Sequence, residues 1–265
     1  MFQKMFISSQ KFRKSKCKDL RNQGNINDRI FDRHLGVHGF DQIKYSNSRV
    51  DIVGAGMNTE LGEGLVRKGM GKISYIDYDI VSLPNLNRQY YQESDIGKPK
   101  AFQIIKNLQK LGFMGTELFG YNDFVQNYLE IHNPKPDIFV CGVDNDEARI
   151  CIAKYGLKHS IPVIFTAVSR DANQCYVFIQ KPDQACFGCV FPEAIHNSVS
   201  PCPNTPSMKD IIKVASGLVL FAIDSVLMGR PITWNFRMFY LAGFMDDSKS
   251  VKQRNINCEL CSKVG

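Results

Sequence analysis

Two pairs of cysteines have the spacing of a metal site. Cys186 and Cys189 form one Cys-x-x-Cys pair, and Cys258 and Cys261 form a second. Each pair can place two thiolates on one ion, and four thiolates complete the tetrahedral shell of a structural Zn²⁺. Such a closed shell leaves no open position for catalysis. Because the two pairs are far apart in the sequence, a second interpretation stays open, in which they are redox dithiols.

A further cysteine lies in a loop outside these pairs. Cys202 is flanked by Pro201 and Pro203 and precedes a helix predicted over 207–228. A thiol near a helix N-terminus can have a lowered pKa and act as a nucleophilic thiolate. We therefore predict that Cys202 is catalytic, with an incidental loop cysteine as the alternative.

A third group of residues has the composition of a phosphate site. Gly54 and Gly56 follow a predicted strand, and glycines at this place let the backbone approach a phosphate. Two acids, two amides and three cations come next in the chain: Asp77, Asp79, Asn85, Asn87, Arg88, Lys98 and Lys100. A nicotinamide site needs little positive charge here, whereas a triphosphate needs several cations. The pattern thus disfavours a dinucleotide oxidoreductase.

The elements that must position these groups alternate along the chain. Strands are predicted over 50–53, 73–76, 116–119, 137–141 and 162–167, and helices over 57–68, 98–111, 124–129 and 145–158. This alternation predicts a doubly wound, mainly parallel, Rossmann-like α/β sheet, which binds ligands beyond the carboxyl ends of its strands. Strands predicted over 175–179 and 232–241 lack crossover helices, and we expect them to extend the sheet as antiparallel strands.

Composition and charge narrow the function classes. The 265 residues are 44% hydrophobic and 22% charged, as in soluble globular proteins. Residues 1–22 hold seven basic residues against one acid, and the whole chain carries a net charge of +7. The basic character therefore belongs to a flexible tail over 1–25, and a fold-wide nucleic-acid surface is excluded. Nine cysteines without a secretory signal predict a reducing, cytoplasmic compartment.

No membrane span is predicted from the sequence. The longest apolar stretch, 214–228, is short for a span and is interrupted by Asp224. We therefore predict that this stretch belongs to a core helix.

Five segments together resemble the ThiF/MoeB/HesA family of ubiquitin-activating-type adenylating enzymes. They are Val53-Gly-Ala-Gly56, Gly69-Met-Gly-Lys-Ile-Ser-Tyr-Ile-Asp-Tyr-Asp79, Pro84-Asn-Leu-Asn-Arg-Gln89, Ile96-Gly-Lys-Pro-Lys-Ala101 and Cys141-Gly-Val-Asp-Asn145. The resemblance runs from about residue 29 to residue 261. It implies an adenylation domain over 26–265, with a C-terminal elaboration that binds zinc through the four paired cysteines.

The resemblance also assigns roles to individual positions. Gly54 and Gly56 match glycines that approach the phosphates, and Asp77 matches the acid that binds the ATP ribose. The groups that match triphosphate ligands are Asn85, Arg88 and Lys100. Asp144 matches the acid that binds Mg²⁺. Arg33 matches an arginine that reaches ATP in the other subunit of a homodimer, and together with Arg88 and Cys202 it is a predicted catalytic residue.

The function implied is ATP-dependent adenylation of the C-terminal carboxylate of a small ubiquitin-like or sulfur-carrier protein that ends in glycine. Transfer to the Cys202 thiol would follow. One alternative is an enzyme that adenylates a peptide in a natural-product pathway. Another is a non-catalytic scaffold, because the family's Gly-x-Gly-Gly-x-Gly turn is replaced by Gly54-Ala-Gly-Met-Asn-Thr-Glu60. This turn lacks the third glycine, and Glu60 adds a negative charge near the phosphates.

Overall fold

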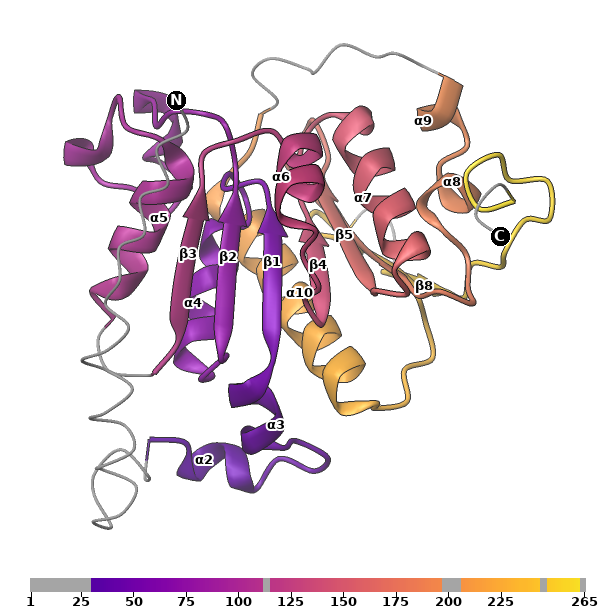
Figure 1. Ribbon diagram of the computed structural model, residues 1–265, viewed down its shortest axis with the longest axis horizontal. Helices are drawn as coiled ribbons and strands as arrows, with labels where there is room; N and C mark the ends of the chain where they lie inside the picture. The colour runs from indigo at the N-terminus through magenta and orange to yellow at the C-terminus, as the bar shows by residue number, and fades with distance from the viewer. Residues whose placement is uncertain (1–29, 112–114, 197–205, 244–246, 263–265) are drawn as a thin grey trace.

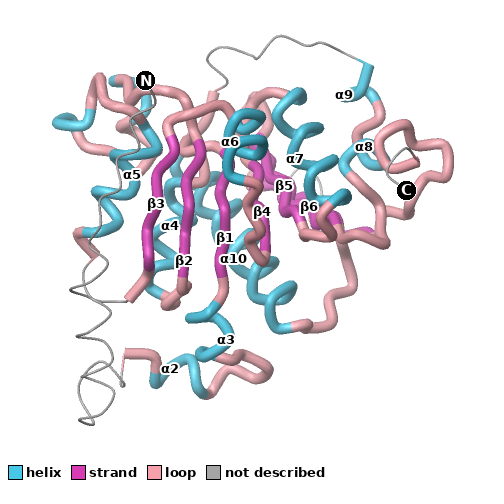
Figure 2. The backbone as a smooth tube through the Cα atoms, in the orientation of Figure 1, coloured by secondary structure: helices cyan, strands magenta, loops and turns pink. Residues whose placement is uncertain are grey.

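One mixed sheet forms the centre of the protein (Figures 1 and 2). The computed structural model describes residues 30–111, 115–196, 206–243 and 247–262. Their strands are β1 (Arg49–Val53), β2 (Lys72–Ile76), β3 (Glu117–Tyr121), β4 (Ile138–Cys141), β5 (Val163–Val168), β6 (Gln174–Gln180), β7 (Phe236–Tyr240) and β8 (Ser248–Ser250). The strand order is β3-β2-β1-β4-β5-β6-β7-β8, parallel through β5 and antiparallel from β6 onward. The predicted fold class is confirmed.

Helices cover both faces of this sheet (Figure 1). The described helices are α2 (Asp32–Leu35), α3 (Gln42–Asn47), α4 (Thr59–Arg67), α5 (Lys100–Gln109), α6 (Val125–His132), α7 (Asp146–Lys158), α8 (Phe187–Val190), α9 (Glu193–His196) and α10 (Lys209–Met228), with 3₁₀ turns η1 (Leu83–Asn85) and η2 (Glu93–Asp95). One hydrophobic cluster joins α4, α5 and α10 to the sheet. A second cluster joins the four helices α6, α7, α8 and α9 to the opposite face of the sheet.

The two clusters follow from the alternation of side chains along each strand. In β1, Val50 and Ile52 belong to the first cluster, and Val53 belongs to the second. Successive side chains of a strand point to opposite faces, so a strand covered on both sides is apolar nearly throughout. Asp51 is the exception on β1, and Arg49 Nε and Tyr128 Oη bond its buried carboxylate at 2.8 and 2.7 Å.

Helix α10 is long and apolar enough to cross a membrane by length and composition alone. It lies instead against β5, β6 and α4, and it buries Val219, Ala222 and Ile223 in the first cluster. Asp224 forms an ion pair with Lys68. These contacts are those of the core helix that the sequence predicts.

Several element boundaries differ from the sequence-based prediction. Helix α4 begins at Thr59, because residues 54–58 form the turn that follows β1. Helix α5 is confined to Lys100–Gln109, and the strand predicted over 232–241 is the shorter β7. The predicted tail over 1–25 lies outside the described residues.

Candidate functional site

The predicted nucleotide residues meet at the carboxyl ends of β1, β2 and β4. β1 lies between β2 and β4, so the chain crosses the sheet in opposite directions on its two sides. Such a switch point is where open α/β sheets bind ligands. Gly54 has φ +94°, and a Cβ there would lie 3.1 Å from the Gly142 carbonyl oxygen. Glycine is required here by both backbone conformation and the close approach of the loop after β4.

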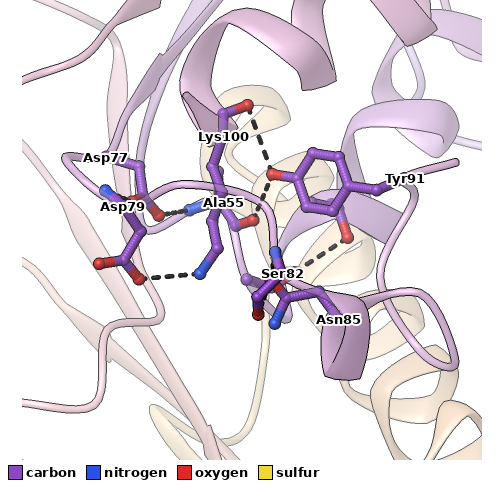
Figure 3. A network of polar contacts seen from close by, with 9 residues as sticks. Ala55, Asp77, Asp79, Ser82, Asn85, Tyr91 and Lys100 are labelled. Carbon is purple, nitrogen blue, oxygen red and sulfur yellow. Dashed lines mark hydrogen bonds and ion pairs between the residues drawn. The ribbon is translucent and has the colours of Figure 1, made fainter. Parts of the chain in front are cut away.

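Asp77 organises the glycine turn. One carboxylate oxygen accepts the Ala55 N–H at 2.5 Å, and the other accepts the Asp79 N–H at 2.8 Å (Figure 3). Burial raises the pKa of Asp77 above its ordinary value, although the Lys100 charge and the two N–H bonds act in the opposite direction. The carboxylate keeps lone pairs that could accept ribose hydroxyl groups.

Lys100 reaches the same edge from the first residue of α5. Its Nζ lies 2.8 Å from Asp79 Oδ2, and its backbone N–H bonds the Asp79 carbonyl at 2.8 Å. The side chain is 10% exposed, whereas that of Asp79 is 49% exposed. An enclosed ammonium beside a solvent-facing carboxylate can exchange that partner for a phosphate. Tyr91 fixes the turn by donating its hydroxyl to the Ala55 carbonyl at 2.6 Å (Figure 3).

Asn85 and Arg88 belong to the turn that follows β2. Asn85 Oδ1 accepts the Ser82 N–H at 2.9 Å, so the amide NH₂ is the part of this side chain suited to donate to a phosphate (Figure 3). Arg88 Nη1 donates to the Pro84 carbonyl and to Asn87 Oδ1. The guanidinium is thus folded onto its own turn.

Asp144 lies on the loop between β4 and α7 and is exposed. Arg149 holds this loop by donating to the Val143 carbonyl at 2.6 Å and to Asp146 Oδ1 at 2.7 Å. Asn145 caps α7 by accepting the Ala148 N–H at 2.9 Å. The sequence-based prediction did not include Arg149. A Mg²⁺ ion needs oxygen ligands at fixed positions, and these hydrogen bonds fix the loop that carries Asp144.

The altered turn is braced by Thr59 and Asn58. Thr59 Oγ1 donates to the Gly56 carbonyl at 2.9 Å and accepts the Tyr90 N–H at 3.0 Å. Asn58 fills the space beside Gly142, where a Cβ would lie 2.4 Å from its Nδ2. The missing third glycine therefore leaves a closed, hydrogen-bonded turn. The sequence carries no signal for the Thr59–Tyr90 bond or for the close approach of Asn58 and Gly142, because they join segments about 30 and 80 residues apart.

Two aromatic rings complete the edge. Tyr78 and Phe124 are each about half exposed, and their rings stack with centroids 4.2 Å apart. The pKa of Tyr78 is raised by burial and then by the charges of Asp79, Asp144 and Asp77. Tyr78 stands between Asp77 and Asp79 in the chain. Sequence reasoning missed the pair, although one of its members directly follows the predicted ribose acid.

Arg33 lies away from this edge in its own chain. Phe31, just before α2, packs against Gly69, and Gln42 Nε2 donates to the Lys68 carbonyl at 2.9 Å. Both contacts are at the C-terminal end of α4, whereas its N-terminal end faces the glycine turn (Figure 1). The exposed Arg33 therefore does not join the other predicted residues within one chain. Cys202 lies outside the described residues.

The four paired cysteines come together at the other end of the sheet. Their Sγ atoms all lie within 4.8 Å of one another. Individual separations are 3.5 Å for Cys186–Cys189, 3.5 Å for Cys186–Cys258 and 3.7 Å for Cys189–Cys261. Tetrahedral Zn–S bonds of about 2.3 Å require S···S separations of about 3.8 Å. The cluster therefore fits a zinc ion with little adjustment.

The surroundings of the cluster also suit a metal site. The Asn255 N–H points at Cys189 Sγ from 3.3 Å, and such N–H···S bonds stabilise bound thiolates. A Cβ at Gly188 would lie 3.2 Å from Cys258 Sγ and 3.0 Å from the Leu260 Cβ, so the first pair needs glycine inside it. Three of the four cysteines are part of the second hydrophobic cluster, which also contains Phe187, and Cys189 packs against it.

Comparison with known proteins identifies relatives of this chain. The model of the ThiF family matches residues 30–261. The chain is 27% identical over 237 residues to the sulfur carrier protein adenylyltransferase of Thermus thermophilus, covering 86% of each. It is 26% identical over 234 residues to the adenylyltransferase and sulfurtransferase MOCS3 of Caenorhabditis briggsae, covering 86% of this chain and 57% of that protein. The chain thus spans little more than half of that second relative.

Solved structures share the fold. Escherichia coli MccB crystallised with SeMet MccA superposes with a TM-score of 0.72 at 19% identity, covering 94% of this chain and 81% of that one. MccB with ATP gives a TM-score of 0.69 at 21% identity, covering 83% and 68%. At this level of identity the likeness shows a common architecture.

Proposed function

The chain belongs to the ThiF family, and from this premise we propose that it is an adenylyltransferase that transfers AMP from ATP to a carboxylate. The observation that carries the proposal is the convergence of the glycine turn with Asp77, Lys100 and Asp144 at the switch point of the sheet. Polar groups from separate strands gather there in the arrangement that a nucleotide needs.

In the proposed reaction, a carboxylate oxygen attacks the α-phosphorus and the bond to the β-phosphate bridging oxygen breaks. The products are an acyl-adenylate and pyrophosphate. The N-terminus of α4, Lys100 and Arg88 would stabilise the charge that moves onto the pyrophosphate. Asp77 would bind the ribose hydroxyls. Mg²⁺ held at Asp144 would neutralise phosphate charge.

The exposed rings of Tyr78 and Phe124 suit the adenine base. They stand beside Asp77, at the place where a base would follow a ribose held by that carboxylate. A purine can stack on an aromatic face without a specific hydrogen bond. Stacking alone would select weakly among purines, so we expect GTP to compete with ATP measurably.

We propose the C-terminal carboxylate of a small sulfur-carrier or ubiquitin-like protein as the acceptor. The support is the relative from Thermus thermophilus, named a sulfur carrier protein adenylyltransferase, which matches this chain over 86% of both lengths. We place the reaction in the cytoplasm and in a homodimer, as proposals that rest on the cysteine content and on the Arg33 position.

The test is isotope exchange between pyrophosphate and ATP in the presence of defined acceptors. A carrier protein ending in glycine should support exchange, and the same carrier with its C-terminus amidated should not. If only a short peptide with a free C-terminus supports exchange, the acceptor class is a peptide. If no carboxylate supports exchange and ATP does not bind, the protein is a scaffold and the proposal fails.

Transfer from the adenylate to Cys202 is a separate proposal. Cys202→Ala should keep pyrophosphate exchange, because adenylation precedes attack by the thiol, and should lose the thiol-sensitive enzyme–carrier adduct. Cys151→Ala, on α7, is the matched control and should keep both. Persistence of the adduct in Cys202→Ala would exclude this cysteine as the nucleophile.

A further inference from the structure

Glu60 introduces a carboxylate at the first turn of α4, beside the glycine turn. Its side chain is only 9% exposed and pairs with Lys209 Nζ. Lys209 is the first residue of α10, and 149 residues separate it from Glu60 in the chain. The ion pair thus joins two helices at the nucleotide edge, by which we mean the carboxyl ends of β1, β2 and β4 and the turns that follow them.

The same ammonium also contacts the predicted phosphate-binding turn. Lys209 Nζ donates to the Arg88 carbonyl oxygen at 3.3 Å. The nitrogen therefore lies between the first turn of α4 and the segment that carries Arg88. No other described residue joins these two segments through a charged side chain.

The balance of charges at the nucleotide edge makes the position of the Lys209 ammonium important. The edge gathers the carboxylates of Glu60, Asp77, Asp79 and Asp144, whereas the cations that match triphosphate ligands of the family are Arg88 and Lys100. A triphosphate adds further negative charge to the same place. Unlike Asp77, whose carboxylate accepts the Ala55 and Asp79 N–H groups, Glu60 accepts no backbone N–H in the described hydrogen bonds, and its only described charged partner is Lys209.

We propose that Lys209 is a positioning residue of the nucleotide edge, whose charge cancels that of Glu60 and thereby permits tight binding of ATP. The inference rests on the proposed function, because it concerns the same nucleotide. Lys209 compensates for the departure of this chain from the family turn. Without its ammonium, the enclosed carboxylate repels the triphosphate through a medium of low polarity.

The test compares the dissociation constant of the α,β-methylene analogue of ATP across four proteins. Lys209→Gln should raise this constant about tenfold, and more at low ionic strength, because an uncompensated charge is screened by salt. Lys209→Arg should bind as the wild type does. Glu60→Gln combined with Lys209→Gln should restore binding to within about threefold of wild type, since the repelling charge is removed.

A matched control lies on the same helix. Arg67 and Glu63 form an exposed ion pair on α4, with side chains 58% and 31% exposed. Arg67→Gln should leave the dissociation constant unchanged, which separates the effect of position from that of net charge. Circular dichroism of each variant verifies that binding is measured on folded protein.

The outcomes distinguish the two proposals. Failure of the wild type to bind the analogue would overturn both the function and this inference. Normal binding by Lys209→Gln would overturn the inference alone. An equally weak double variant would also overturn it, because the loss would then come from the broken contact with Arg88 rather than from the Glu60 charge.

Discussion

The cysteine cluster and the nucleotide edge are built in different ways. The cluster draws its four ligands from two short turns, and its sulfur atoms already lie near the separations that a metal requires. The nucleotide edge draws on the ends of three strands, two turns and two helices, and its charged groups are bound to one another. Arg88 bonds its own turn, and Lys100 pairs with Asp79.

This difference indicates that the cysteine cluster stabilises the fold, whereas the groups at the nucleotide edge can exchange their hydrogen-bond and ion-pair partners. A preformed ligand set binds a metal as part of folding, so its loss costs stability. Charged groups that satisfy one another can release those partners to a substrate at little cost, so their loss costs activity. The predictions below test this division.

The largest effect should come from the cluster. Cys258→Ser should remove the metal and lower the free energy of unfolding by more than about 3 kcal/mol, because structural zinc contributes folding energy directly. Metal analysis and urea unfolding of protein purified without chelator measure both effects, with Cys151→Ser as the control that keeps zinc. A wild type with less than about a tenth of an equivalent of zinc would contradict the assignment.

The second effect should be on activity without a change in stability. Asp144→Asn should reduce pyrophosphate exchange by about a thousandfold, since a metal-binding acid supplies several kcal/mol of charge stabilisation. Asp144 is exposed, so the thermal unfolding midpoint of the variant should match that of the wild type. Glu147→Gln, also exposed near the start of α7, should retain full exchange. Equal activity in Asp144→Asn would refute the Mg²⁺ role.

The two regions also differ in how far sequence predicts them. Cys186 and Cys189 are three residues apart, and one local turn brings their thiols together, so spacing alone identifies the pair. The parallel sheet follows from the alternation of apolar strands and amphipathic helices. By contrast, the bonds of Thr59 to Tyr90 and of Lys209 to Glu60 join distant segments, and no local pattern encodes them.

Short elements were also beyond prediction. Strand β8 has the sequence Ser-Lys-Ser, which has no apolar alternation, and it pairs with β7 in an antiparallel register. Helices α8 and α9 have four residues each, too few for a helical period to appear. The role of Asp77 in holding the Ala55 N–H likewise depends on two strand ends meeting in space.

The third effect concerns Arg33, which the structure places far from the edge in its own chain. If a partner subunit supplies it, Arg33→Ala should lower exchange at least about a hundredfold, as for arginines supplied in trans. Mixing Arg33→Ala with Asp144→Asn should then restore up to about a quarter of wild-type activity, because each mixed dimer has one intact site. Lys44→Ala, on α3, is the control. No recovery on mixing, or a fully active monomer, would exclude a shared site.

The smallest effect is a pH dependence of stability at Asp77, and it should run opposite to that of the cluster. Burial raises the pKa of Asp77 in the folded state, so the folded protein binds this proton more readily than the unfolded chain does. Between the ordinary aspartate pKa of about 3.9 and the raised folded value, the contribution of Asp77 to the free energy of unfolding should fall as pH rises.

The Asp77→Asn variant lacks this titration. Urea unfolding of both proteins across acidic pH, each with its metal bound, should therefore show the difference shifting in favour of the variant as pH increases. Zinc binding changes in the other sense, because thiolates are lost as pH falls, and taking the difference between the two proteins cancels that common effect. A difference that stays constant would show that the Lys100 charge and the Ala55 and Asp79 N–H bonds offset burial, and a shift toward the wild type would show that they outweigh it.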